Sequence, residues 1–264
     1  MKKVSLVLAS ILAILCFSGC GSKDVKLDLN KISKELDNLT SDEISFSGID
    51  YEEIGVFGDL KFVYDYDFKK LFGLDSELIS EYSVNYNEKT KEILAIFKPV
   101  SASYDEVKKQ LESFMNSINA TLEEYNGVLI YVASKDNSKV IEKVKSYKTP
   151  VFPEMIEVSK NEIKDILDVD SSSVDKFLMK MPMMMVQSST YIIVKPNTKD
   201  YNLVKEKLDS YMLSLEEQWS NYLPDQYELV KNRKVETLGD YLIYIVSENN
   251  DLVYNTILNN KIEG

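Results

Sequence analysis

The chain contains no histidine, and its only cysteines, Cys16 and Cys20, lie within or just after an N-terminal apolar run. Catalytic triads and dyads that use histidine or cysteine are therefore excluded, as are zinc sites with nitrogen and sulfur ligands. Disulfides are excluded too, because Cys16 is expected to leave with a signal segment. Any enzyme would have to use carboxylates, lysine, tyrosine or serine alone. Our expectation is a protein that is not an enzyme and that has no catalytic residue, no metal site and no cofactor.

Arginine is nearly absent as well, since Arg233 is the only one among 31 basic residues. The formal net charge is −12, and it falls to −14 when the first nineteen residues, which hold two lysines and no acid, are removed. Nucleic-acid binders depend on positive charge and on the bidentate contacts of arginine with phosphate. We therefore expect this acidic chain to bind no nucleic acid.

The N-terminus has the layout of a secretory signal. Lys2 and Lys3 precede an apolar run at residues 4–17, and the small pair Ser18-Gly19 leads to Cys20. The run is shorter than the about 20 apolar residues that a membrane-spanning helix needs, and a charged start, an apolar centre and a small-residue cleavage site are typical of a signal peptide.

This pattern resembles a bacterial lipoprotein signal, in which the cysteine after the cleavage point becomes lipid-modified. The resemblance implies that residues 1–19 are removed, that Cys20 carries the lipid, and that residues 20–26 are a tether. The protein is then expected on the outer face of the cytoplasmic membrane, bound to it through Cys20. The alternative is an ordinary signal peptide followed by an incidental cysteine.

One strand-to-helix unit occurs twice in the remaining sequence. Residues 93–115 and 190–212 each contain an apolar strand, a Lys-Pro pair that ends it, and a helix. The apolar residues of both helices recur at intervals of four, three, one and three, which predicts a stripe that packs on a sheet. A continuous apolar strand follows each helix, at residues 128–132 and 242–246, and its composition indicates burial on both faces.

We therefore predict an α+β protein with two tandem repeats, each a small antiparallel sheet with a long amphipathic helix packed on one face. The first repeat is placed at residues 27–148 and the second at 149–264, because the two prolines in residues 149–153 exclude a helix through the junction. The first repeat is the shorter copy. The second has about sixteen extra residues, around 219–236, between its long helix and its last strand.

The start of the first repeat has two less regular segments. Apolar residues at helical spacing predict an amphipathic helix that begins near Leu29 and ends near Leu39. Alternation of apolar and polar residues around two glycines predicts strand or loop at residues 51–66.

The second repeat resembles a bacterial lipoprotein family known as domain of unknown function 4358. The resemblance rests on Lys195-Pro196, Glu216-Glu217-Gln218, Tyr222-Leu223-Pro224, Tyr227 and Gly239-Asp240-Tyr241. The first repeat resembles the same family more weakly, because it lacks the Tyr-Leu-Pro segment. Members of the family look like lipid-anchored envelope proteins, and the resemblance implies no activity, cofactor or catalytic residues.

The extra segment of the second repeat supplies the candidate partner surface. Trp219, the only tryptophan, lies there with Tyr222 and Tyr227. Tryptophan and tyrosine are enriched at the centres of protein contacts, so these three residues are our candidates for a binding surface. The alternative, which the family resemblance favours, is an apolar cap that closes the longer repeat.

Three other groups of residues resemble known kinds of site in part. The methionines in residues 179–185 could bind Cu(I), but Met179 and Met181 alternate like residues that face a core. Asp168 and Asp170 begin like a calcium loop but lack its glycine and its final glutamate. The pair at Asp65 and Asp67 could serve a carboxylate-based hydrolase, although 43 acidic residues make such pairs common.

We expect a lipid-anchored extracytoplasmic protein that acts as a non-catalytic binding or scaffolding module of the bacterial envelope. Its partner would be an envelope protein or a component of the cell wall. The first alternative is a solute-binding or transporter-accessory lipoprotein, and the second is a carboxylate-based hydrolase.

Overall fold

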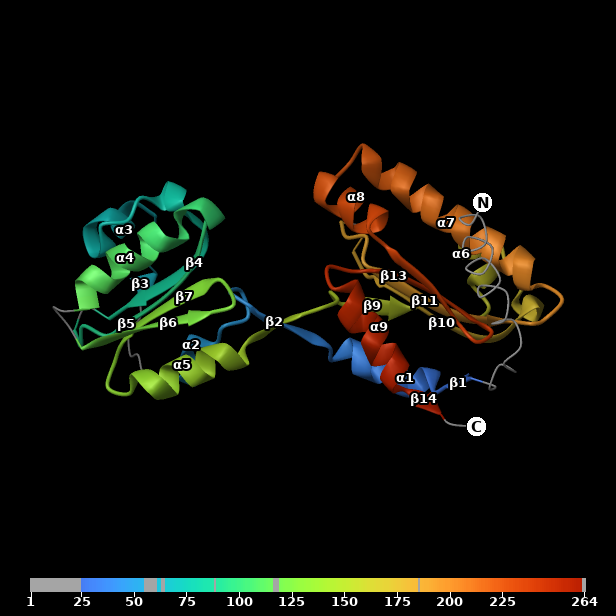
Figure 1. Cartoon of the computed structure of the whole chain (residues 1–264), viewed down its shortest axis with the longest axis horizontal. Helices are drawn as coiled ribbons and strands as arrows, with labels where there is room; N and C mark the ends of the chain where they lie inside the picture. The colour runs from blue at the N-terminus through green and yellow to red at the C-terminus, as the bar shows by residue number, and fades with distance from the viewer. Residues whose placement is uncertain are drawn as a thin grey trace, which may run out of the picture. The chain divides into compact units, whose positions relative to one another are not determined.

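The computed structural model describes residues 25–54, 61–62, 65–87, 89–115, 119–184 and 186–262 (Figure 1). The chain forms two compact units. The inserted unit consists of residues 40–150, and the split unit combines the described residues up to 39 with those from 151 onward. One unit therefore interrupts the sequence of the other.

This division differs from the predicted boundaries at both ends of the inserted unit, since residues 149–150 were expected in the second repeat but belong to the inserted unit. Residues 27–39 were expected in the first repeat, together with the residues up to 148, but they belong to the split unit. Leu27, Ile32 and Leu36 are buried in a cluster with Tyr191 and Ile243. The amphipathic stripe was predicted correctly, whereas the sheet on which it packs was not.

The split unit is built on a five-stranded antiparallel sheet with the order β12-β13-β11-β10-β9. The strands are β9 (Met155–Glu157), β10 (Val174–Pro182), β11 (Thr190–Pro196), β12 (Lys234–Leu238) and β13 (Tyr241–Val246). Helices cover both faces of the sheet, which explains why β11 and β13 are almost continuously apolar and buried.

The long helix α7 (Tyr201–Ser220) packs on one face of this sheet, beside the short α6 (Ile163–Leu167), which precedes the turn η3 (Ser171–Ser173). Helix α8 (Pro224–Lys231) follows α7 and contacts it. The opposite face carries α1 (Leu29–Asp37) and α9 (Asn250–Asn259). The short strands β1 (Lys26–Leu27) and β14 (Lys261–Ile262) pair with each other.

The inserted unit has a second five-stranded antiparallel sheet, with the order β3-β4-β5-β7-β6. The strands are β3 (Lys61–Phe62), β4 (Ile79–Tyr86), β5 (Ile93–Pro99), β6 (Ala120–Tyr125) and β7 (Val128–Ala133). A separate pair, β2 (Thr40–Ile44) with β8 (Lys148–Pro150), joins the ends of the unit.

Helices cover both faces of this sheet as well. One face carries α3 (Asp65–Phe72) and α4 (Tyr104–Met115). The turn η1 (Ser76–Leu78) leads from α3 into β4, and the turn η2 (Ser101–Ser103) leads from β5 into α4. The other face carries α2 (Tyr51–Ile54) and α5 (Asn137–Ser146). Helix α2 replaces the strand or loop predicted there, because the Asp50 carboxylate accepts a hydrogen bond from the Glu53 amide at 3.0 Å and caps the turn.

The two sheets have the same strand order. If the strands of each unit are numbered along the chain, both sheets have the spatial order first, second, third, fifth, fourth. Ile93 begins β5 and Thr190 begins β11, and each of these strands is the third of five. The predicted fold class, α+β with small antiparallel sheets and a long helix on one face, is confirmed. In the described residues, the main difference between the units is that α7 is longer than α4 and is followed by α8.

Candidate functional site

A cavity of about 210 Å³ opens in the split unit between α7 and the segment that joins β10 to β11. We call it the Trp219 cavity. It is lined by Ile166, Met181, Pro182, Met184, Gln187, Ser188, Thr190, Tyr211, Leu215, Gln218 and Trp219. Among the described residues none that lines it carries a carboxylate or an amine, so the cavity suits an apolar group rather than an ion.

The wall formed by the β10–β11 segment begins at Pro182, which ends β10. Helix α8 holds the other end of this segment. The Ser188 amide donates a hydrogen bond to Gln226 Oε1 at 2.8 Å, and the Ser188 hydroxyl donates to the Gln226 carbonyl at 3.1 Å. The cavity therefore depends on α8, the helix formed by the extra residues of this unit.

Arg233 secures the end of α7 from the other side. Its guanidinium donates to Glu216 at 2.8 Å and to the Val230 carbonyl at 3.0 Å. Both side chains of the ion pair are less than one-third exposed, and Pro224 starts α8 at the first helical position, where no amide is needed. The only arginine of the chain is thus used to fix the helices that surround the cavity.

Two of the aromatic side chains in the lining, those of Trp219 and Tyr211, carry hydrogen-bond donors. Trp219 is 2% exposed, and its indole N–H has no acceptor in the part of the chain that the structure describes. Burial raises the pKa of Tyr211 to about 12, so its hydroxyl stays protonated near neutral pH. A buried donor without a partner costs about 1–3 kcal/mol. These groups favour a ligand that brings an acceptor.

The surface next to the cavity is also apolar. Met183 is 52% exposed, Met184 67% and Val186 48%, and all three lie in the β10–β11 segment. Tyr222 is 62% exposed, and its ring lies 5.8 Å from that of Trp219. Exposed apolar side chains grouped beside a cavity are typical of interaction sites. The arrangement can bind an apolar group.

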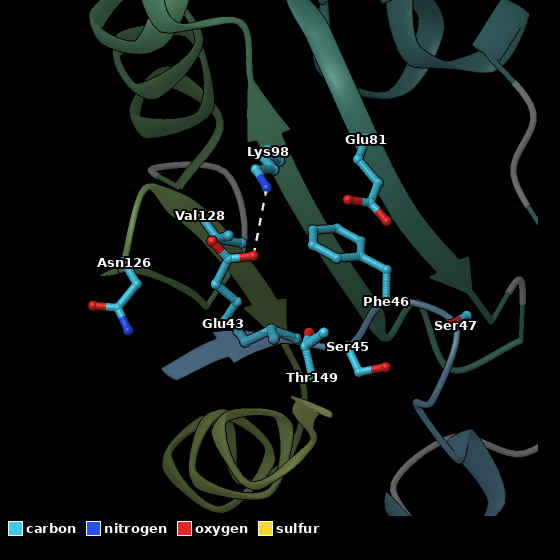
Figure 2. Close-up of a pocket in the computed structure, with 10 residues that line it drawn as sticks. Glu43, Ser45, Phe46, Ser47, Glu81, Lys98, Asn126, Val128 and Thr149 are labelled. Atoms are coloured by element: carbon cyan, nitrogen blue, oxygen red, sulfur yellow. Dashed lines mark ion pairs between the residues drawn. The ribbon is translucent and has the colours of Figure 1, made fainter. Parts of the chain in front are cut away.

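The inserted unit contains a different cavity, of about 170 Å³. Figure 2 shows Glu43, Glu81 and Lys98 around it, with the ring of Phe46 beside them. Lys98 Nζ lies 3.9 Å from a Glu43 carboxylate oxygen, and both side chains are about half exposed. Exposed ion pairs contribute little stability. This cavity is polar and open, and it suits a small hydrophilic solute better than an apolar one.

Comparison with protein families gives a match to part of the chain. Residues 148–247 match DUF4358, a domain of unknown function. The chain therefore contains a DUF4358-like domain. The match covers β9 to β13 with α6, α7 and α8, so all residues that line the Trp219 cavity lie inside it. No curated protein and no solved structure matches the chain.

The structure separates the three aromatic candidates. Trp219 lines the cavity of the DUF4358-like domain, whereas Tyr222 contacts the Trp219 ring without lining it. Tyr227 is partly buried against the core, and Lys231 Nζ lies 5.6 Å from its ring centre. Cys20, the predicted lipid attachment site, lies outside the described residues.

The methionine run divides between core and cavity. Met179 is fully buried, and Met181 packs against the same cluster, as their alternation predicted. Met184 was assigned no separate role from the sequence, yet it lines the cavity. The sequence did contain a signal for this difference. Pro182 ends the strand, so the alternation that places Met179 and Met181 in the core does not extend to Met184.

The two aspartate groups considered above, Asp168 with Asp170 and Asp65 with Asp67, were not predicted to be sites. The Asp168 carboxylate is engaged by Lys164 at 2.8 Å and by Lys207 at 2.6 Å. Among the described residues no group of three or more histidine, cysteine, aspartate or glutamate side chains could hold a metal ion. The side chains of Asp65 and Asp67 lie outside the described part of the chain. Within that part, no helix is long and apolar enough to cross a bilayer.

Proposed function

We propose that this protein is a lipid-anchored envelope protein whose DUF4358-like domain is a non-catalytic binding module, with the Trp219 cavity as its binding site. One observation carries the proposal: a preformed, largely apolar cavity whose lining includes Trp219, with a buried indole N–H that has no acceptor among the described residues, and which has exposed methionines beside it. Apolar concave sites with a few polar groups are the usual form of binding sites in proteins.

The proposed anchor is Cys20, supported by the signal-like residues before it. Replacement by Cys20→Ala is expected to move the protein from the membrane fraction to a soluble or uncleaved form. Metabolic labelling with a radioactive fatty acid should mark the wild type and not the variant. Unchanged fractionation and labelling would refute the anchor while leaving the binding site untested by that experiment.

The binding site can be tested with an apolar probe. We would use the chain from residue 20 onward with Cys20→Ala and titrate it with n-hexanol, following the emission of Trp219, the only tryptophan. A saturable change is expected in this chain. Ile166→Phe should abolish it by filling the cavity, whereas Leu203→Phe should not, because Leu203 is exposed and does not line the cavity.

Ligand-dependent stabilisation gives a second readout, because a ligand that binds only the folded state raises the melting temperature. If n-hexanol neither changes the Trp219 emission nor raises the melting temperature, the Trp219 cavity is not a binding site and the proposal fails. An equal response in Ile166→Phe would likewise place hexanol elsewhere.

We also propose that the two units derive from duplication of one domain. The shared strand order and the repeated strand-to-helix sequence support this origin. On this view the inserted unit is the copy without a Trp219 cavity, since the described part of that unit has no equivalent of α8. The binding role then lies in the DUF4358-like copy.

A further inference from the structure

We infer that the Trp219 cavity receives one apolar side chain from a basic polypeptide segment of a partner protein. The inference rests on the proposed function, because it names the class of ligand for the same cavity. The size of the cavity, the charge around it and its place in the domain each support this occupant.

The cavity has room for a single side chain. An apolar cavity of about 150 Å³ is large enough to bind benzene, and drug-sized ligands occupy about 300–1,000 Å³. At about 210 Å³ the Trp219 cavity lies between these sizes. A leucine or phenylalanine side chain fits this range. The backbone carbonyl next to such a residue would supply an acceptor for the hydroxyl of Tyr211 or the indole N–H of Trp219.

The charge next to the cavity favours a basic segment. Residues 182–190 carry no charge, and residues 213–229 contain four acidic residues and no basic one. Arg233 neutralises Glu216, and Lys231 lies 3.5 Å from Glu228. Glu217 and Asp225 are exposed and have no ion pair with the described residues. This surplus attracts lysine and arginine and repels anionic lipid headgroups.

The position of the cavity also argues against the membrane as its occupant. Val25, near the end of the proposed tether at residues 20–26, packs against Gly239 in the turn between β12 and β13. That turn is at one end of the sheet, next to the pair Val194–Leu242, whereas the cavity residue Thr190 pairs with Val246 at the other end. In Figure 1, β1 and α8 accordingly lie toward opposite ends of this sheet.

The tether is too short to change this geometry. Val25 lies five residue steps after Cys20, and an extended chain of that length spans at most about 18 Å. An anchor at Cys20 therefore holds the turn at Gly239 near the membrane and directs the opposite end of the sheet toward the envelope. A polypeptide in the envelope can reach the cavity more readily than a lipid chain can.

The test uses defined peptides with the chain from residue 20 onward carrying Cys20→Ala. The probe is the capped heptapeptide Lys-Lys-Gly-Leu-Gly-Lys-Lys. Three controls replace its leucine with glycine, its lysines with glutamates, or its lysines with serines. Carbon-13 methyl signals of Met181 and Met184 report on the cavity, and that of Met115 in the inserted unit is the internal control.

The lysine peptide with leucine is expected to shift the Met181 and Met184 signals and to bind about tenfold more tightly than the glutamate peptide at low salt, with the difference narrowing as salt rises. The glycine peptide should not bind. Glu217→Gln with Asp225→Asn should reduce the preference for lysine several-fold and leave the serine peptide unaffected. Glu206→Gln, at an exposed position elsewhere on α7, should change neither the preference for the lysine peptide nor the binding of the serine peptide.

The possible failures point to different conclusions. If the lysine and glutamate peptides bind equally, the basic class of partner is wrong while the binding site stands. If n-hexanol binds and no leucine peptide does, a polypeptide is the wrong occupant. Shifts caused instead by phosphatidylglycerol vesicles would assign the cavity to the membrane. If neither hexanol nor peptides bind, the proposed function itself has failed.

Discussion

The ammonium group of Lys180 donates to both carboxylate oxygens of Asp37, at 2.7 and 2.6 Å, although 143 positions separate the two residues. Lys180 is 8% exposed and lies on β10, and Asp37 ends α1. The pair therefore fixes the N-terminal helix to a sheet whose strands all lie beyond the inserted unit in the sequence.

Asp37→Ala is expected to lower the free energy of unfolding of the split unit by about 1–3 kcal/mol, because it leaves the buried ammonium of Lys180 unpaired. Denaturant unfolding followed by circular dichroism measures the change. Asp170→Ala is the control, since its ion pair with Lys164 is exposed, and it should cost less than about 0.5 kcal/mol. Equal costs would contradict the prediction. Asp37→Ala with Lys180→Met should recover part of the loss.

Gly239→Ala should destabilise the turn between β12 and β13 more than Gly127→Ala destabilises the turn between β6 and β7. Both glycines have positive φ, +58° and +79°, which costs alanine about 1–2 kcal/mol. A Cβ at Gly239 would also lie 2.9 Å from the Val25 Cβ, whereas one at Gly127 meets nothing within 4 Å. Calorimetry should show that Gly239→Ala lowers the free energy of unfolding more than Gly127→Ala does, by roughly 1 kcal/mol.

Trp219→Phe tests the unpaired indole N–H. The smaller ring loses apolar contacts, but it also removes a buried donor without a partner, so the two effects oppose each other. We expect the free energy of unfolding to stay within about 1 kcal/mol of the wild type, while Trp219→Ala should lose about 3–5 kcal/mol. Chemical denaturation followed by circular dichroism measures the free energy of unfolding of both variants. A loss of 3 kcal/mol or more in the phenylalanine variant would mean that the N–H is satisfied in the folded protein.

The lowered pKa of Asp168 makes the stability of the folded protein depend on pH in the acidic range. Hydrogen bonds from Lys164 and Lys207 lower the pKa of Asp168 to about 2, below its ordinary value near 4. Because the folded-state pKa is the lower one, the stabilisation is present above about pH 4 and is lost as the pH falls toward 2. Asp168→Asn keeps a side chain that tolerates the left-handed backbone at φ 52°.

The measurement for Asp168 is the melting temperature of wild type and Asp168→Asn from pH 2 to 6 at low salt. The wild type should be more stable above pH 4, and the difference should shrink toward zero as the pH falls to 2, because the Asp168 carboxyl is then largely protonated in the unfolded chain and about half protonated in the folded one. A difference that does not change with pH would show that the two lysines do not stabilise the charged form.

Local patterns in the sequence determined much of this fold. The continuous apolar runs at residues 128–132 and 242–246 and the helices at residues 104–115 and 201–215 could be predicted, because each run or stripe reports burial independently of its partner. Trp219 was also found from the sequence, as the only tryptophan in a segment present in one repeat.

Only the tertiary structure decided which surfaces meet. The stripe of α1 shows that one face is buried, but it cannot identify the sheet that covers it, and the ion pair of Asp37 with Lys180 depends on a contact across the inserted unit. The Trp219 cavity required Gln226 to hold Ser188, 38 positions away. Periodicity records the environment of a residue and not the identity of its neighbours, so the sequence determined the elements and the long-range contacts determined the site.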